Sequence, residues 1–405
     1  MAGPQVSLAP PSRPARVLVV YHSAGKPSNQ RIFEAMAAHR GIRLRVLGPR
    51  RGYSETDAAV YEIPGRRRGV YELVPGRVYK ALHHLAGPYV TGLAREIALF
   101  RPDVIHVFGE AYTAVLTQAL MYRRLLHPRA VCYGMSSQIA RFPAPAGRAA
   151  CWRRAFVRKE CAGIACWTES AKDALKQDGF PEGKLAVTHW GVPLDSFNPG
   201  RNEELKSQLG CSGCFVVGYV GSVEIETGLW TLLHAMRRLP PSFKCLCVGD
   251  GSWLGALMEK ARAFGVAERV CAVGAVPHDR VPFYMHAMDA LVVPSESCMG
   301  LTPAFSRVLP EAMACSVPVV AAKCGVLPEI MGEAGLSFQE RDFTDLAGCL
   351  LRLSTDASLR ASLGRAGRER SESLFASEAF AARLMTLYGI PPGNGGARRQ
   401  GCDDE

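Results

Sequence analysis

The feature that most constrains the fold is an alternation, present in both halves of the chain, of short β-rich runs with segments of helical period. Each apolar run ends in glycine or polar turn residues, and a segment with helical spacing follows it. Such an alternation is typical of parallel sheets whose strands are joined by crossover helices. Because 405 residues exceed what one hydrophobic core usually supports, we expect two α/β domains.

The expected elements follow this pattern in order. In the first half we expect strands at 17–21, 42–47, 103–108, 131–133, 163–167 and 185–188, and helices at 30–39 and 89–100. The basic, glycine-rich segment 50–77 is predicted to be an irregular surface excursion. In the second half we expect strands at 215–220, 244–248, 269–273, 290–293, 317–321 and 336–338, and helices at 229–238, 253–264, 279–287, 304–314 and 343–354.

The domain limits come from the places where the alternation lapses. We predict a first Rossmann-like domain over 14–192, a linker over 193–212 and a second Rossmann-like domain over 213–375. A helical segment, 376–390, is expected to return to the first domain, and both ends of the chain, 1–13 and 391–405, are expected to be disordered. Two doubly wound sheets facing each other would create a crevice at the carboxyl ends of their strands, where such sheets bind ligands.

Composition narrows the class of protein. A net charge of +11 favours anionic ligands or surfaces, but no helix-turn-helix, zinc-finger or RNP-like pattern supports nucleic-acid binding. No signal peptide precedes the first strand, and no apolar run approaches the ~18–20 residues that a spanning helix needs. With its 14 cysteines mostly in apolar contexts, the chain is expected to be cytoplasmic. The Cys211-x-x-Cys214 pair lacks a second pair, so inert thiols are favoured over zinc.

Two glycine turns in the second half have the backbone freedom to approach phosphate. Gly218-Tyr-Val-Gly221 and Gly249-Asp-Gly251 each follow an expected strand. Neither forms the G-x-G-x-x-G fingerprint, which disfavours a dinucleotide-dependent dehydrogenase. No nucleophile elbow is present, so hydrolase chemistry is not favoured either. Taken alone, these glycines are equally consistent with simple turns.

The stretch PSESCMGLTPAFSRVLPEAMACSVPVVAAKCGVLPEIMGEAG (294–335) is far more specific. It resembles the donor-binding core of the family-4 retaining glycosyltransferases, whose usual pattern is Glu-x-Phe-Gly followed by Glu-Ala-Met-Ala-x-Gly-x-Pro-Val-Val. VVGYVGSVEIETG, CVGDG and RPDVIHVFGEAYTAVLTQAL match further family segments in the family's order, so the resemblance covers nearly the whole chain. It implies a GT-B fold, with two Rossmann-like domains facing across a cleft, and transfer of a hexosyl-type sugar from a nucleotide-diphosphate sugar with retention.

The resemblance also implies roles for individual residues. Glu311 would bind the ribose hydroxyls, since a carboxylate accepts two such donors. His106 and Glu110 would be catalytic residues on the opposite wall. No metal ligand set is implied, although a divalent metal is possible, and the nucleotide sugar itself is the co-substrate. The donor-binding residues would be Gly25, Gly221, Ser222, Thr227, Gly249, Gly274, Val276, Phe305, Ser306, Leu309 and Glu311.

The chain departs from the family at several of these positions. Ser222 and Thr227 replace the Arg and Lys of the phosphate turn, and Pro303 replaces the first Glu of the motif. Ser306 and Ser316 stand where the family has glycine. Three explanations fit these departures. Other cations, such as Arg307 or Lys323, or a divalent metal would stabilise the leaving diphosphate, or the donor would have a different phosphate chemistry. The third explanation is that the protein is catalytically silent.

The sequence indicates the acceptor and the cellular location of the protein less directly than the donor. The resemblance implies a glycan or lipid-linked acceptor, in surface polysaccharide or glycolipid synthesis. In the segment 151–164, Trp152 and Phe156 alternate with four cations, which fits either a solvated basic helix face or docking on an anionic membrane at its inner face. The alternative functions are a silent GT-B relative that binds a glycan, lipid or partner protein and, more remotely, a nucleotide-sugar epimerase.

Overall fold

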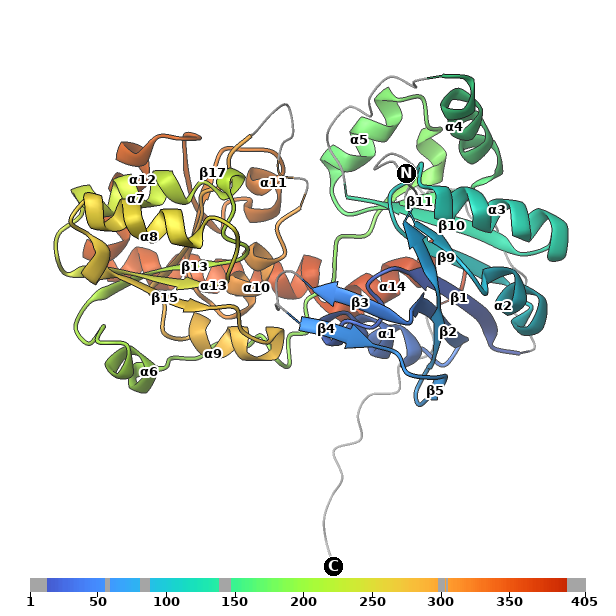
Figure 1. Cartoon of the computed structure of the whole chain (residues 1–405), viewed down its shortest axis with the longest axis horizontal. Coiled ribbons are helices and arrows are strands. Elements are labelled where there is room, and N and C mark those ends of the chain that lie inside the picture. The colour runs from blue at the N-terminus through green and yellow to red at the C-terminus, as the bar shows by residue number, and fades with distance from the viewer. Residues whose placement is uncertain are drawn as a thin grey trace, which may run out of the picture.

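The computed structural model describes residues 13–54, 59–80, 88–137, 147–297, 303 and 305–391. It has two lobes, each built on a mainly parallel sheet with helices on both faces (Figure 1). The expectation of two Rossmann-like α/β domains is therefore confirmed. The two ends of the chain that were expected to be disordered lie almost entirely outside the described residues.

The first domain is built on an eight-stranded sheet with the order β12-β11-β10-β9-β1-β2-β6-β5. All its pairings are parallel except that of β5 with β6. Its main strands are β1 (Ala15–Tyr21), β2 (Ile42–Pro49), β9 (Val104–Phe108), β10 (Val131–Ser136), β11 (Gly163–Cys166) and β12 (Leu185–Val187). Its helices are α1 (Pro27–Ala37), α2 (Leu93–Phe100), α3 (Ala114–Leu126), α4 (Arg148–Glu160) and α5 (Glu169–Gln177).

The segment 50–77 is more regular than predicted. It contains a hairpin of β3 (Arg51–Ser54) and β4 (Ala59–Glu62), followed by β5 (Arg67–Arg68) and β6 (Glu72–Gly76). Strand β6 pairs in parallel with β2, placing Arg45 opposite Glu72. The Arg45 guanidinium binds Glu72 at 2.7 Å and the buried Glu96 at 2.9 Å. These paired charges inside the sheet interrupt the apolar alternation, which is why the sequence pattern did not indicate a strand.

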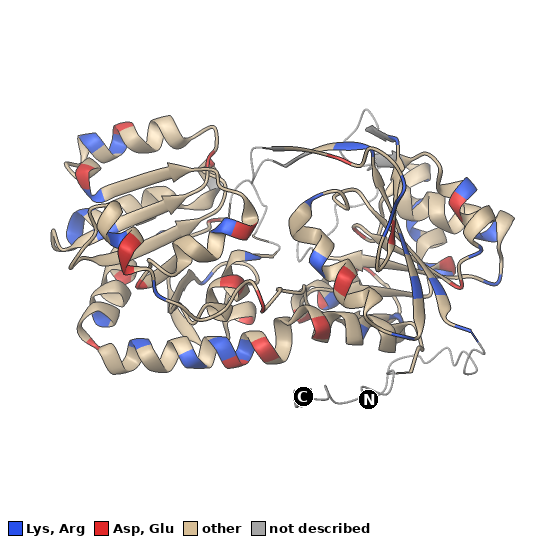
Figure 2. Ribbon diagram, turned by 90° about the horizontal axis from the view of Figure 1, so that it is seen from below, with Lys and Arg blue, Asp and Glu red and all other residues tan. Residues whose placement is uncertain are grey.

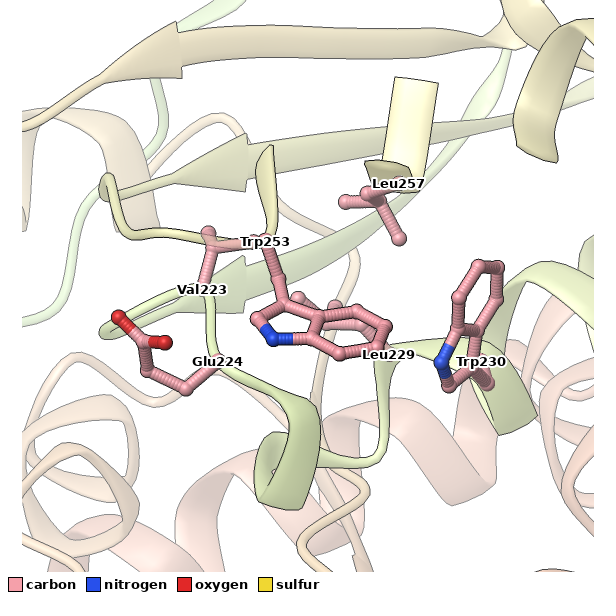
Figure 3. A pocket seen from close by; sticks show the side chains of 6 residues that line it. All are labelled: Val223, Glu224, Leu229, Trp230, Trp253 and Leu257. Carbon is pink, nitrogen blue, oxygen red and sulfur yellow. The ribbon is translucent and has the colours of Figure 1, made fainter. Parts of the chain in front are cut away.

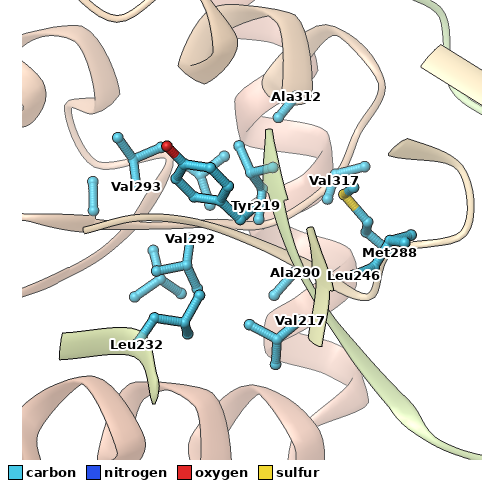
Figure 4. Packing of buried hydrophobic residues seen from close by; sticks show 14 of the residues in the cluster. Val217, Tyr219, Leu232, Leu246, Met288, Ala290, Val292, Val293, Ala312 and Val317 are labelled. Carbon is cyan, nitrogen blue, oxygen red and sulfur yellow. The ribbon is translucent and has the colours of Figure 1, made fainter. Parts of the chain in front are cut away.

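The second domain has a six-stranded, entirely parallel sheet with the order β15-β14-β13-β16-β17-β18. Its core is tightly packed around the central strands (Figure 4). A Cβ on Gly218 would lie 2.0 Å from Met288 Sδ, so a larger residue at this strand position would displace the Met288 side chain. The strands are β13 (Phe215–Val220), β14 (Phe243–Val248), β15 (Val270–Gly274), β16 (Ala290–Val293), β17 (Val319–Ala322) and β18 (Gly335–Phe338). The helices between them are α7 (Leu229–Arg238), α8 (Leu254–Ala263), α9 (Val281–Met285), α10 (Val308–Ala314) and α11 (Leu327–Met331), and α12 (Phe343–Thr355) follows β18.

The segment between the domains is not a free tether. It contains the short helix α6 (Glu203–Gln208), and Leu205 and Cys211 are buried in the second domain's core. Helix α13 (Ala357–Arg370) belongs to the second domain, and a five-residue π-helical turn, η5 (Ser371–Phe375), leads from it into α14 (Ser377–Leu387).

Helix α14 packs against α1 in the first domain (Figure 1). Its Phe380 and Leu384 join the first domain's core. No helix in the part of the chain that the structure describes is both long and apolar enough to cross a bilayer.

Candidate functional site

A cavity of about 360 Å³ lies at the carboxyl ends of the second domain's strands. It is lined mainly by the loops that follow β13, β14 and β16 and by the start of α10, and Lys26 of the first domain also lines it. Because strand ends in a parallel sheet meet at one edge, loops distant in sequence converge here. Of the residues expected to bind the donor, the cavity is lined by Gly221, Ser222, Thr227, Gly249, Val276, Phe305, Ser306 and Glu311.

Three expected donor-binding residues lie elsewhere. Leu309 is fully buried in the core of the second domain, on the inner face of α10. Gly274 does not line the cavity; its carbonyl accepts the Gly249 amide at 2.8 Å and so holds the Gly249 loop from behind. Gly25 lines a neighbouring cavity instead, on the first domain's side.

The phosphate turn is built from close backbone approaches that only glycine permits. Gly249 has φ +143°, and a Cβ on it would lie 1.8 Å from the Gly221 carbonyl oxygen. Gly228, with φ +73°, closes the other end of the turn, where a Cβ would lie 1.8 Å from the Pro294 carbonyl oxygen. Thr227 donates its hydroxyl hydrogen bond to the Glu224 carbonyl at 2.7 Å. The turn is thus shaped to bring backbone close to a ligand but carries no positive side chain.

Behind this turn the packing is nearly complete. Trp230 and Trp253 meet edge to face with ring centroids 5.9 Å apart, beside Val223 and Leu257 (Figure 3). The gap between them measures about 10 Å³, room for one water at most. The Glu224 carboxylate accepts hydrogen bonds from the amide and hydroxyl of Ser252, which ties the turn to the next loop. We therefore interpret these packed side chains as structural support for the turn, and the small gap between them is not a ligand site.

Glu311 is the acidic group of the cavity. It is 5% exposed, and its Oε1 accepts a hydrogen bond of 2.9 Å from His278 Nε2. Among the described residues, no hydrogen bond reaches its second carboxylate oxygen. His278 comes from the loop after β15, and its ring packs against Phe197 at 5.2 Å. A buried carboxylate with one oxygen held and the other unused has the geometry to bind hydroxyl groups.

His278 was not among the residues predicted from sequence. It lines the Glu311 cavity and a second, larger cavity of about 660 Å³ that lies between the two domains. The second cavity is lined by α1, by β4 and by the loop at 277–279. A Cβ on Gly25 would lie 2.5 Å from the Tyr61 ring, so the β3–β4 hairpin rests directly on this turn.

The two residues expected to be catalytic lie outside both cavities. His106 is completely buried on β9; its Nδ1 lies 2.6 Å from the Tyr388 hydroxyl, and its Nε2 lies 3.0 Å from the Gly134 carbonyl. Burial lowers the pKa of His106 to about 3, so the ring is neutral. Both ring nitrogens are engaged inside the core and the side chain lines neither cavity, so this structure does not support the expected catalytic role of His106.

Glu110 follows β9 and is half-buried. Its carboxylate accepts hydrogen bonds from the Ser136 hydroxyl at 3.0 Å, the Ser137 amide at 3.1 Å and the Ser137 hydroxyl at 2.6 Å. It therefore fastens the end of β10 and does not line either cavity. The segment 138–146 that follows β10 lies outside the described residues.

The cysteines of the C-x-x-C pair show no metal-binding geometry. Cys211 is buried, its thiol faces the Leu209 carbonyl at 3.5 Å, and burial raises its pKa. In the described ranges, no group of three or more His, Cys, Asp or Glu side chains is arranged to hold a metal ion.

Comparison with known proteins agrees with this architecture. Residues 29–196 match the family model "Glycosyltransferase Family 4", and residues 201–370 match "Glycosyl transferases group 1". A D-inositol 3-phosphate glycosyltransferase from Rhodococcus opacus is 27% identical over 375 residues, covering 87% of this chain and 82% of that protein. One from Segniliparus rotundus is 33% identical over 219 residues, covering 51% and 46%. Arabidopsis thaliana sulfoquinovosyl transferase SQD2 is 28% identical, covering 68% and 54%. The chain thus spans about half the length of the Segniliparus and Arabidopsis relatives.

Solved structures show the same fold at low sequence identity. The Anabaena protein HepE in complex with UDP superimposes with a TM-score of 0.72 at 18% identity, covering 92% of this chain and 98% of that one. Sucrose-phosphate synthase from Thermosynechococcus elongatus gives 0.69 at 19% identity, covering 92% and 98%. The two adjoining family models, which together match most of the chain, and these two-domain neighbours lead to one conclusion: the chain belongs to the family-4 glycosyltransferases with the GT-B fold.

Proposed function

We propose that this protein transfers a sugar from a nucleotide-diphosphate sugar to an acceptor hydroxyl, with retention of anomeric configuration. The observation that carries the proposal is Glu311, a buried carboxylate with one free oxygen in a cavity walled by glycine turns. Glu311 would accept the ribose hydroxyls, while the Gly221 and Gly249 loops bring backbone toward the diphosphate. HepE, of the same fold, is described in complex with UDP and with UDP-glucose, which supports a nucleotide-sugar donor.

The acceptor would occupy the larger cavity. Its volume of about 660 Å³ suits a glycan or the head of a lipid-linked acceptor, and its walls combine carboxylate, guanidinium and apolar side chains, as in Glu62, Arg31 and Val60. His278 lines both cavities, so donor and acceptor would meet beside it. The domains' main contribution would be to orient the two substrates and to exclude water.

Retention follows from the chemistry that the family resemblance implies. The leaving phosphate would take the proton of the acceptor hydroxyl, so no side-chain nucleophile is required. Among the residues described as lining the donor cavity, Glu311 is the one carboxylate, and we assign it to the ribose. Proton NMR of the first product formed would show the donor's anomeric configuration; the inverted anomer would contradict the proposal.

Replacing Glu311 tests the donor site. Glu311→Gln keeps the side chain's size but removes its charge, and we expect UDP affinity in calorimetry to fall by roughly 10- to 100-fold, since hydrogen bonds to charged groups contribute about 1.5–3 kcal/mol. Glu333→Gln, at an exposed position of the same domain, is the matched control. Equal UDP affinities for both variants would remove the assignment of Glu311.

A catalytically silent relative is the competing function. Such a protein would bind nucleotide through Glu311 but would neither transfer the sugar nor hydrolyse the donor, because the neutral Ser222 and Thr227 leave the turn without cations. A screen of UDP-, GDP- and ADP-sugars for release of nucleoside diphosphate, with and without glycan and lipid-linked acceptors, separates the two. Binding without any release would favour the silent relative.

We further propose that α4 docks the enzyme on the anionic, cytoplasmic face of a membrane, where glycolipid or surface-polysaccharide acceptors reside. Trp152 is 54% exposed and stacks on Phe156 with ring centroids 5.0 Å apart. Neighbouring α3 exposes Leu125 and Leu126. Exposed aromatic and aliphatic side chains beside cations match the requirements of an interfacial helix.

The structure reduces the cations available for this docking. Arg154 and Arg158 both pair with Asp178, so they serve the fold. Arg148, Arg153 and Lys159 remain on α4, and elsewhere basic residues are interspersed with acidic ones over both domains (Figure 2). Docking should therefore depend on the aromatic pair as much as on charge.

Vesicle co-sedimentation tests the docking proposal. Wild-type protein should bind vesicles containing anionic lipid, and binding should fall with salt. Trp152→Ala should reduce it severalfold, whereas Phe283→Ala, at an exposed aromatic of the second domain, should not. Equal recovery of wild type on neutral and anionic vesicles would contradict the proposal.

A further inference from the structure

The phosphate turn has no positive side chain, so other residues of the cavity must neutralise the negative charge of the diphosphate. A nucleoside diphosphate brings two or more negative charges, yet the turn contributes only the neutral Ser222 and Thr227. A buried polyanion is costly unless cations or hydrogen-bond donors surround it. The lining residues include two cations, Arg307 and Lys26, and they approach from opposite domains.

Arg307 comes from the donor domain, immediately before α10. Its Nη1 donates to Asn29 Oδ1 of the first domain at 3.2 Å, and its guanidinium lies over the Trp190 ring at 5.4 Å. Its Nε–H is buried and has no hydrogen-bond partner among the described residues. A buried donor without an acceptor costs free energy, and this donor belongs to a guanidinium that lines the cavity.

Lys26 comes from the turn between β1 and α1 of the first domain. It lines the same cavity as Arg307 and Glu311, although its own chain segment belongs to the opposite wall. Lys323, another cation considered from the sequence, is exposed and is not among the residues lining the cavity. The candidates for neutralising phosphate charge therefore narrow to Arg307 and Lys26.

We propose that Arg307 and Lys26 bind the diphosphate of the donor, in place of the cations missing from the phosphate turn. This inference rests on the proposed nucleotide-sugar function and adds the groups that hold its charge. Because Asn29 orients Arg307 and Lys26 belongs to the first domain, the diphosphate site is complete only when both domains contribute. Phosphate binding is thereby coupled to closure of the cleft, whereas the nucleoside is held by the second domain alone.

A second contact shows that the domains meet at another edge in this structure. The Glu329 carboxylate, on α11 of the second domain, accepts the Glu169 amide at 2.6 Å and the Ser170 amide at 3.1 Å, at the start of α5 in the first domain. A carboxylate at a helix N-terminus satisfies amides that lack helical partners. The domain arrangement in which Arg307 and Lys26 line one cavity thus has a second interdomain contact, outside that cavity.

Calorimetric titration with uridine and UDP tests the assignment. We expect Arg307→Gln to weaken UDP binding about 10- to 100-fold and uridine binding less than about threefold, because only UDP carries the charge that Arg307 meets. Arg307→Lys keeps the positive charge but loses the paired N–H donors of the guanidinium, so its UDP affinity should lie between those of wild type and Arg307→Gln. Lys323→Gln removes the same charge outside the cavity and should match wild type for both ligands.

Variants of the first domain test the coupling across the cleft. Lys26→Gln should weaken UDP about 3- to 30-fold and Asn29→Ala about 3- to 10-fold, with uridine unchanged in both. Thermal unfolding of each variant without ligand confirms that it is folded. Since both residues belong to the opposite domain, a loss confined to UDP supports a shared diphosphate site.

The contrary outcomes are distinct. If Arg307→Gln and Lys323→Gln bind UDP equally, the assignment of Arg307 is wrong while the proposed function stands. If EDTA abolishes wild-type UDP binding and Mg²⁺ restores it equally in Arg307→Gln, a metal carries the charge and the inference is again wrong. If wild type binds neither UDP, GDP nor ADP at millimolar concentration, the proposed function and the inference fail together.

Discussion

The two walls of the cleft differ in how they are built. On the second domain's wall, Gly221, Gly249 and Glu311 line one cavity together. On the first domain's wall, His106 is buried in the core and Glu110 fastens a strand end, and neither is among the described residues that line these two cavities.

The difference reflects the way each wall is assembled. The second wall consists of turns that directly follow strands of one sheet, so each turn's place follows from its own strand. The first wall is made of segments distant in sequence: the β3–β4 hairpin lies over the Gly25 turn, and Tyr388, at the end of the returning helix, binds His106. Local sequence therefore specifies the wall of the second domain, whereas tertiary packing determines the wall of the first domain.

The largest expected effect is a loss of stability when one glycine in each wall is replaced by alanine. Gly249→Ala would place a Cβ 1.8 Å from the Gly221 carbonyl oxygen at φ +143°, so backbone itself must move. We expect a loss of about 3 kcal/mol in the free energy of unfolding and no measurable UDP binding. A Cβ on Gly25 would meet only side chains, the Tyr61 ring at 2.5 Å and Ile63 at 3.2 Å, and a side-chain shift relieves such contacts, so we expect a loss of about 1–2 kcal/mol. Urea unfolding and UDP calorimetry measure both.

A second substitution sharpens this contrast. Tyr61→Ala should recover most of the stability lost in Gly25→Ala, because it removes the atoms that the new Cβ meets. No side-chain truncation relieves Gly249→Ala, since the obstructing atom is a carbonyl oxygen. Equal losses for the two glycine variants would mean that the walls do not differ in rigidity.

The next effect concerns the buried histidine of the first wall. Burial lowers the pKa of His106 to about 3, below the ~6.5 expected in the unfolded chain. The unfolded state therefore binds more protons between these values, so the stability that neutral His106 allows is present above pH ~6.5 and is lost as pH falls toward 3. From pH 6 to 4, wild type should lose up to about 1.4 kcal/mol per pH unit more than His106→Gln, measured as urea midpoints.

His286→Gln, at a histidine of the second domain whose Nε2 bonds the Asn198 carbonyl at 2.8 Å, is the comparison variant for the same urea measurements. If His106→Gln instead lowers turnover at pH 7.5 while stability and its pH slope stay unchanged, His106 has a catalytic role after all.

These contrasts explain how much was predictable. The alternating pattern located β13 and β16 at their observed limits, since central parallel strands are continuous apolar runs. It missed β6, where Glu72 pairs with Arg45 inside the sheet. His278 carried only a weak signal, a histidine in the loop after β15, and its contact with Glu311 depends on packing that sequence spacing does not describe.

The smallest effect tests one departure from the family pattern, Ser316. It follows α10 with φ +57°, the left-handed region that glycine adopts without steric cost. Ser316→Gly should relieve about 1–2 kcal/mol of backbone strain but add conformational entropy to the unfolded chain, leaving a gain of about 0.5–1 kcal/mol and a melting temperature higher by roughly 1–3 °C.

The first domain offers a matched position. Arg101, which follows α2 and is exposed, also has a left-handed backbone, with φ +49°. If the gain arises from the backbone alone, Arg101→Gly should give a gain of the same size in differential scanning calorimetry, and UDP affinity should change in neither variant. A gain at Arg101 without one at Ser316 would show that the Ser316 side chain stabilises the donor domain in a way that offsets its strain. The Ser316 side chain would then compensate for the absence of the family's glycine. The wall of the donor domain would in that case depend less on glycine backbone conformations than the clash predicted for Gly249→Ala indicates.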